Sequence, residues 1–161
     1  MATKTDELLV ERSEDGILTL TLNRPDRLNA ISGPMLNALS ETLQEANIDP
    51  EVRVVVLTGA GRGFCSGLDL KDTASGNGPG VARGYRLFDL HNSPPIVLNR
   101  MDKPVLCALN GAAAGYGMDM ALGCDIRIAS EHAKMGAVFA RRGVLPESGG
   151  CRPRRGCLGR R

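Results

Sequence analysis

Two glycine-rich segments carry the residues whose type and spacing could do chemistry. Residues 59–67 read GAGRGFCSG, and residues 110–117 read NGAAAGYG. Each follows an apolar run and precedes a stretch that could begin a helix. Each is therefore expected to expose backbone N–H groups beside the partial positive charge of a helix start. Two such turns facing each other could hold one oxygen that becomes negative during reaction, as an oxyanion hole built from backbone donors does.

Glycine-rich turns also have simpler uses. One alone often serves only as a tight connection between elements. A phosphate-binding loop is a second alternative, but no GxxxxGK[ST] motif occurs in the chain. The spacing G-x-G-x-x-G is not met at 59–64, because position 64 is Phe. Nucleotide hydrolysis is therefore disfavoured.

The remaining reactive side chains lie in sequence contexts that do not indicate a functional site. His91 and His132 lack the partner pattern of a metal site or a catalytic triad, so we expect surface residues and no metal. Nothing near Cys65 in the sequence predicts a lowered pKa. Cys107 and Cys124 lie in apolar runs, which predicts buried thiols.

Hydrophobic periodicity and the positions of Gly, Pro and Ser predict the elements that position the two turns. Alternation predicts a hairpin of strands 7–12 and 17–23 around Asp15-Gly16. Ser32 and Pro34 predict a helix that ends near Ile48. Buried strands are expected at 52–58 and 105–110, and a further strand at 124–129, with helix-like residues at 118–123. We expect a loop at 73–84, then two helical pieces interrupted by Ser93-Pro94-Pro95. The alternating order predicts an α/β fold.

Composition limits the class of protein. The chain has 161 residues, 42% of them hydrophobic, which suits one domain with a core. Residues 151–161 carry five Arg and no acid, and this tail accounts for the net charge of +2. No nucleic-acid motif accompanies it, so nucleic-acid binding is not expected. With no apolar leader and no membrane-length run, a cytoplasmic protein without membrane contact is expected.

Three blocks carry a family resemblance. They are LTLNRPDRLNAIS (20–32), VVVLTGAGRGFCSGLDL (54–70) and KPVLCALNGAAAGYGMDMALGCDIRIAS (103–130). In content, order and spacing they resemble the N-terminal blocks of the crotonase superfamily, the enoyl-CoA hydratases and isomerases. The resemblance covers roughly residues 7–150. It implies an α/β fold with a ββα spiral core, an acyl-CoA thioester substrate, and no cofactor beyond the coenzyme A of that substrate.

The resemblance also implies roles for individual residues. The two oxyanion amides fall on Leu68 and Tyr116, where Tyr replaces the family's frequent Gly. The segments along the coenzyme A and near the adenine and thioester match Arg27, Leu28, Ala30, Ser66, Asp69 and Leu70. The alternative for Asp69 is that it lies at the start of a helix, where its negative charge interacts favourably with the helix dipole.

The pair of acids with which hydratases of this family transfer protons is incomplete in this chain. The first hydratase Glu corresponds to Asp119, and the second falls on Phe139. Glu147 matches the single base of some isomerases, and one carboxylate can move a proton between two carbons. The alternatives are that Asp119 caps or pairs on its own helix and that Glu147 is a solvated loop acid.

The resemblance fails after Gly150, which divides the chain into a core at 1–150 and an Arg-rich tail at 151–161. The family continues with a C-terminal helical region that this chain lacks, so we expect a truncation or a frame change near residue 150. Two hypotheses follow. One is an enoyl-CoA hydratase or isomerase, assembled as a trimer or hexamer if the family's assembly survives. The other is an inactive fragment that at most binds coenzyme A or pairs with relatives.

Overall fold

The computed structural model describes residues 5–71 and 92–138. The chain enters through an antiparallel hairpin of β1 (Leu8–Arg12) and β2 (Ile17–Leu22), which confirms the predicted pair. Gly16 closes its turn with φ +80°, a conformation that L side chains rarely adopt. The hairpin forms one side of the main sheet.

The first long helix, α1 (Gly33–Ile48), begins where its capping residue predicts. The Ser32 hydroxyl accepts a hydrogen bond from the Met35 N–H at 3.1 Å, and Pro34 lies in the first turn. The helix buries one face of apolar side chains, among them Leu36, Leu39 and Leu43. The short 3-10 helix η1 (Pro25–Arg27) precedes it.

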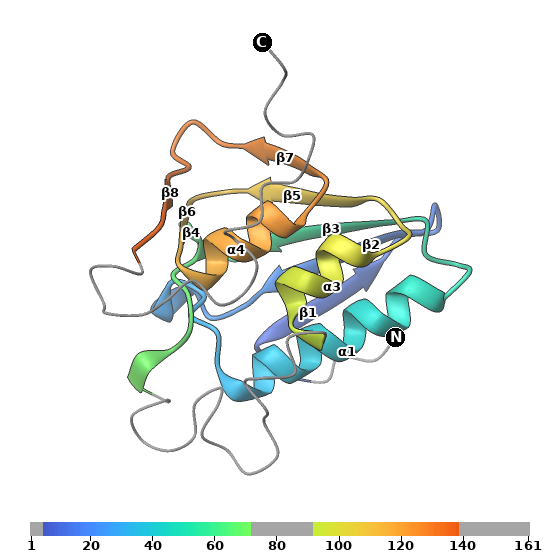
Figure 1. Cartoon of the computed structure of the whole chain (residues 1–161), viewed down its shortest axis with the longest axis horizontal. Helices are drawn as coiled ribbons and strands as arrows, with labels where there is room; N and C mark the ends of the chain where they lie inside the picture. The colour runs from blue at the N-terminus through green and yellow to red at the C-terminus, as the bar shows by residue number, and fades with distance from the viewer. Residues whose placement is uncertain (1–4, 72–91, 139–161) are drawn as a thin grey trace.

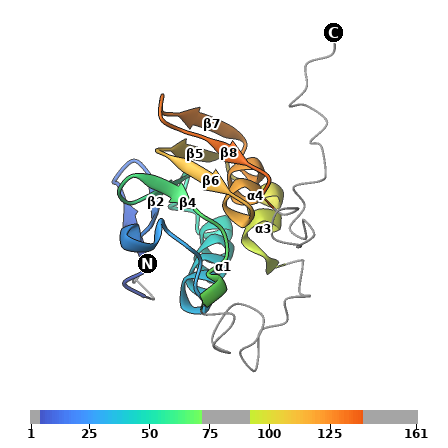
Figure 2. The ribbon, with the colours of Figure 1, turned by 90° about the vertical axis from the view of Figure 1, so that its left-hand side faces the viewer.

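The main sheet has the order β1-β2-β3-β5-β7, with β3 (Val54–Gly59), β5 (Val105–Leu109) and β7 (Ile126–Ala129). All pairings after the hairpin are parallel. Figures 1 and 2 show α1, α3 (Pro94–Arg100) and α4 (Tyr116–Gly123) on one face of this sheet. Leu, Val and Met side chains fill the core between these layers.

A second, smaller sheet stands at the carboxyl ends of the parallel strands (Figure 1). Its strands β4 (Gly63–Cys65), β6 (Ala112–Ala114) and β8 (Met135–Gly136) are parallel in the order β4-β6-β8. The sequence predicted loops at β4 and β6 and no element at β8, because strands of two or three residues leave no alternation to read. Both glycine-rich turns therefore belong to the edge where the two sheets meet.

Other expectations met different outcomes. The proline pair begins α3 at Pro94, with Ser93 at the capping position, so it starts a helix. Strand β7 confirms the strand predicted at 124–129, and its Ile126 and Ile128 are largely exposed. The predicted loop at 73–84 and the boundary at Gly150 lie outside the described residues. Within the described part of the chain, no helix is long and apolar enough to cross a membrane.

Candidate active site

The two glycine-rich turns lie directly against each other. A Cβ on Gly67 would stand 3.1 Å from the Ala114 carbonyl oxygen and 3.7 Å from the Tyr116 nitrogen. Gly67 also has φ +104°, which side chains rarely adopt. The end of the first turn therefore touches the start of α4, as a site built from both turns requires.

Leu68 lies on a parallel bridge to Ile31. The Ile31 N–H donates to the Gly67 carbonyl at 2.8 Å, and the Asp69 N–H donates to the Ile31 carbonyl at 2.9 Å. These two hydrogen bonds fix the backbone on both sides of Leu68 and leave the Leu68 N–H out of the bridge. The bridge therefore fixes the position of the Leu68 N–H, which takes no part in the hydrogen bonds of the bridge.

Tyr116 is the first residue of α4, after Gly115 with φ +52°. The N–H groups of a first helical turn have no acceptor within their own helix, and they carry its partial positive charge. The Asp119 N–H donates to the Gly115 carbonyl at 3.1 Å and closes this turn. The structure therefore brings the turn that carries Leu68 against the helix start that carries Tyr116.

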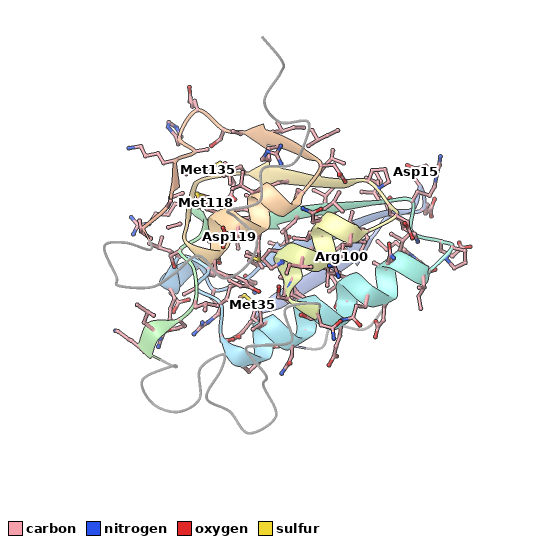
Figure 3. The ribbon with its side chains drawn as sticks, in the orientation of Figure 1. Asp15, Met35, Arg100, Met118, Asp119 and Met135 are labelled. Carbon is pink, nitrogen blue, oxygen red and sulfur yellow. The ribbon has the colours of Figure 1, made fainter. Side chains whose placement is uncertain are left out.

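Asp119 lies in the first turn of α4 (Figure 3). Its side chain is buried, with 2% of its surface exposed. Among the described residues, neither of its carboxylate oxygens has a hydrogen-bond partner. Burial raises the pKa of this carboxyl from 3.8 to about 6, because the charged form loses its hydration. No contact of the described residues supports the alternative that Asp119 caps or pairs on its own helix.

Asp69 is engaged by basic side chains. Its Oδ2 lies 3.1 Å from Arg24 Nη1 and 3.3 Å from Arg27 Nη1. Its Oδ1 accepts a hydrogen bond from the Lys71 N–H at 3.1 Å, and the side chain is only 5% exposed. The structure therefore places this acid in an ion-paired cluster directly after Leu68.

The other residues predicted for the coenzyme A segments gather on two adjoining stretches. The Ser66 N–H donates to the Leu28 carbonyl at 3.0 Å, and the Ser66 hydroxyl lies 3.4 Å from the Arg27 carbonyl. Leu28 and Leu70 are exposed, whereas Ala30 is buried. No contact here tests a ligand role, so these six assignments stay predictions.

Sequence reasoning missed two residues that build the site. Asn29, fully buried, donates to the carbonyls of Ala60 at 2.9 Å and Gly63 at 2.8 Å, and so holds the first turn. Arg24 joins Asp69 to the segment before α1. Ala60, Gly63 and Asp69 lie more than 30 positions from these two residues, so local spacing could not have revealed the contacts.

The remaining candidates stand apart from this cluster. Glu147 lies outside the described residues. Burial raises the pKa of the Cys65 thiol to about 12, and Cys107 and Cys124 are buried as predicted. His132 is a surface residue beside Glu131. Across residues 5–71 and 92–138, no three His, Cys, Asp or Glu side chains gather as a metal site would need.

Comparison with known proteins identifies the family. The sequence profile described as enoyl-CoA hydratase/isomerase matches residues 12–160, so the match runs past Gly150 and the boundary expected there stays a prediction. The chain is 43% identical to the 1,2-epoxyphenylacetyl-CoA isomerase of Escherichia coli K12, over 89% of this chain and 55% of that protein. A probable peroxisomal enoyl-CoA hydratase 1 of Arabidopsis thaliana is 37% identical over 87% of this chain and 51% of that protein.

Solved structures agree with the sequence matches. An enoyl-CoA hydratase from Mycobacterium tuberculosis H37Rv superimposes with a TM-score of 0.73 at 40% identity, covering 89% of this chain and 57% of that one. The chain spans about half the length of the curated relatives it matches. The fold is the predicted α/β spiral core, and the chain belongs to the enoyl-CoA hydratase/isomerase family of the crotonase superfamily.

Proposed function

We propose that this protein binds an acyl-CoA thioester and moves a proton on its acyl chain, as a hydratase or an isomerase of 2-enoyl-CoA does. The observation that carries the proposal is Asp119, a buried carboxylate whose oxygens have no partner among the described residues. A buried acid left without a partner is unfavourable, and such groups gather where a substrate completes the site.

The two backbone donors supply the second half of the chemistry. The N–H groups of Leu68 and Tyr116 bind the thioester carbonyl oxygen, which becomes negative when the acyl chain forms an enolate. Support comes from the contact between Gly67 and the start of α4, which brings the two turns together. Fixed donors of this kind can lower a barrier by several kcal/mol.

Asp119 then serves as the base. In hydration it takes a proton from the water that adds at C3, while C2 gains a proton; in isomerisation it takes a proton from C2, and C4 gains one. A base with a pKa of about 6 is ionised at neutral pH and holds a proton more strongly than an ordinary Asp. We expect kcat/KM to rise with pH through about 6 and to level off above it.

Two assays separate the reactions. With a trans-2-enoyl-CoA, hydration removes the conjugated thioester and its absorbance falls. With a 3-enoyl-CoA, isomerisation creates the conjugated thioester and its absorbance rises. Turnover in either direction supports the proposal, and the direction assigns the reaction.

Matched Asp→Asn variants test the base. Asp119→Asn should lower kcat by about 10²–10⁴-fold, the usual contribution of a general base. Asp102→Asn makes the same chemical change at an exposed position before β5, and it should leave turnover unchanged. Calorimetric titration with an acyl-CoA completes the test. Binding without turnover would favour the inactive fragment, and absence of both would refute the proposal.

We also propose that the protein forms a homo-oligomer, a trimer or a hexamer. Ile126 is 54% exposed and Ile128 is 63% exposed on β7, which ends the main sheet among the described residues. Exposed apolar side chains on a sheet edge favour contact with another chain. Sedimentation velocity of the purified protein tests this, and a monomer at tens of micromolar would contradict it.

A further inference from the structure

Arg24 stands at the centre of an ion-pair cluster beside the first glycine-rich turn. Its Nε lies 3.1 Å from Glu7 Oε1, and its Nη1 lies 3.1 Å from Asp69 Oδ2. The same Nη1 donates to the Ala30 carbonyl at 2.7 Å. The side chain is 12% exposed, so these contacts are shielded from solvent. One guanidinium therefore joins three separate parts of the chain.

The cluster continues to the start of α1. The Ser32 hydroxyl, which caps α1, donates to the Glu7 carboxylate. The hairpin, the helix start and the segment after Leu68 are thus linked through Glu7, Arg24 and Asp69. Since shielded polar groups are costly to leave unpaired, each member holds the others in one arrangement.

Asp69 connects this ion-pair cluster to the candidate active site, because it directly follows Leu68 in the sequence. Its carboxylate is held by Arg24 and Arg27, and its backbone N–H donates to the Ile31 carbonyl at 2.9 Å. Leu68 is the preceding residue, so anchoring Asp69 fixes one of the two peptide bonds that flank Leu68. These partners enclose most of the Asp69 carboxylate, so little of its surface is accessible to a ligand.

We propose that Asp69 is a positioning residue, which holds the Leu68 N–H at the oxyanion site through its ion pairs with Arg24 and Arg27 and does not contact acyl-CoA. This inference rests on the proposed function for its catalytic consequence. Small displacements of a reacting group can cost about 10²-fold in rate. We expect Asp69→Asn to lower kcat by about 10–100-fold and to change KM by less than about 3-fold.

The experiment pairs steady-state kinetics with amide hydrogen exchange by NMR. The reporter is the Ile31 N–H, which donates to the Gly67 carbonyl. Asp69→Asn should speed its exchange by about 10-fold or more, because local opening becomes easier. Arg12→Gln is the control, since it breaks another Arg–Asp pair, Arg12–Asp49 at 3.4 Å, between the hairpin and the end of α1. The control should change neither exchange nor kcat.

The outcomes distinguish this inference from the proposed function. A raised KM with unchanged kcat and unchanged exchange would make Asp69 a ligand contact and overturn the inference. If the wild type shows no turnover, the proposed function fails, and exchange at Ile31 alone decides whether Asp69 positions the turn. If Asp69→Asn does not fold, Arg27→Gln removes only the 45% exposed partner and keeps Arg24. Faster exchange in that variant supports the inference, and unchanged exchange refutes it.

Discussion

Replacing Asp119 by Asn should change how the stability of the protein depends on pH. In the unfolded chain this carboxyl titrates near 3.8, and in the folded protein it titrates near 6. The folded state therefore binds the proton more tightly than the unfolded state does. The resulting stabilisation is complete below pH 3.8 and is lost as the pH rises through about 6.

The size of this effect follows from the same two values. A difference of about two units between the unfolded and folded pKa of Asp119 corresponds to about 3 kcal/mol of unfolding free energy. Asp119 is 2% exposed, so solvent screens little of it. Asn carries no titrating proton at this site. Relative to the wild type, Asp119→Asn should gain about 2.5 kcal/mol between pH 4 and pH 8, because part of the change has already occurred at pH 4.

Urea unfolding at intervals from pH 4 to pH 8 measures this difference. Asp119→Ala serves as a second variant, because it removes the same titration while leaving a cavity. The two variants should differ in absolute stability and share one pH-dependent difference from the wild type. If the free energies of wild type and Asp119→Asn stay parallel across this range, burial has not shifted this carboxyl and the reasoning fails.

Three further predictions concern the surrounding framework. Gly67→Ala places a Cβ 3.1 Å from the Ala114 carbonyl oxygen at φ +104°, so it should cost about 1–3 kcal/mol of stability and abolish any turnover, as thermal unfolding and the absorbance assay will show. Ser32→Ala removes the cap that accepts from the Met35 N–H and should cost about 1 kcal/mol in urea unfolding, whereas an unchanged midpoint would contradict the capping role. Cys65, buried with a pKa near 12, should react with a thiol reagent only in denaturant, and rapid labelling of the native protein at this position would count against its burial.

The elements of the main sheet could be predicted because their signals are local. Alternation in Ile17–Leu22 and the capping pair at Ser32 and Pro34 placed β2 and α1 to within a residue or two. The strands of the small sheet were missed, because its two- and three-residue strands owe their conformation to neighbours far along the chain. The start of α3 at Pro94 was missed for another reason, because a proline pair predicts a break in a helix, although Pro also fits the first turn of a helix.

The site was predictable in part and for a different reason. Leu68, Tyr116 and Asp119 followed from the family resemblance, and the structure places their segments together. That both Asp119 oxygens lack a partner within the described residues is a property of packing, which no spacing encodes. The ion pairs of Asp69 with Arg24 and Arg27 join positions more than 40 residues apart, so sequence alone favoured a helix-start acid or a ligand.

The strand order of the main sheet has a consequence for synthesis on the ribosome. After the hairpin, β3 pairs with β2, β5 with β3, and β7 with β5. Parallel pairs such as Leu57 with Cys107 join distant residues and usually make folding slow. Here each strand adds to one that has already been translated, so a nascent chain can extend the sheet outward in the order of synthesis. After β1, which waits for β2, no strand of this sheet has to wait for a later one before it finds its first neighbour.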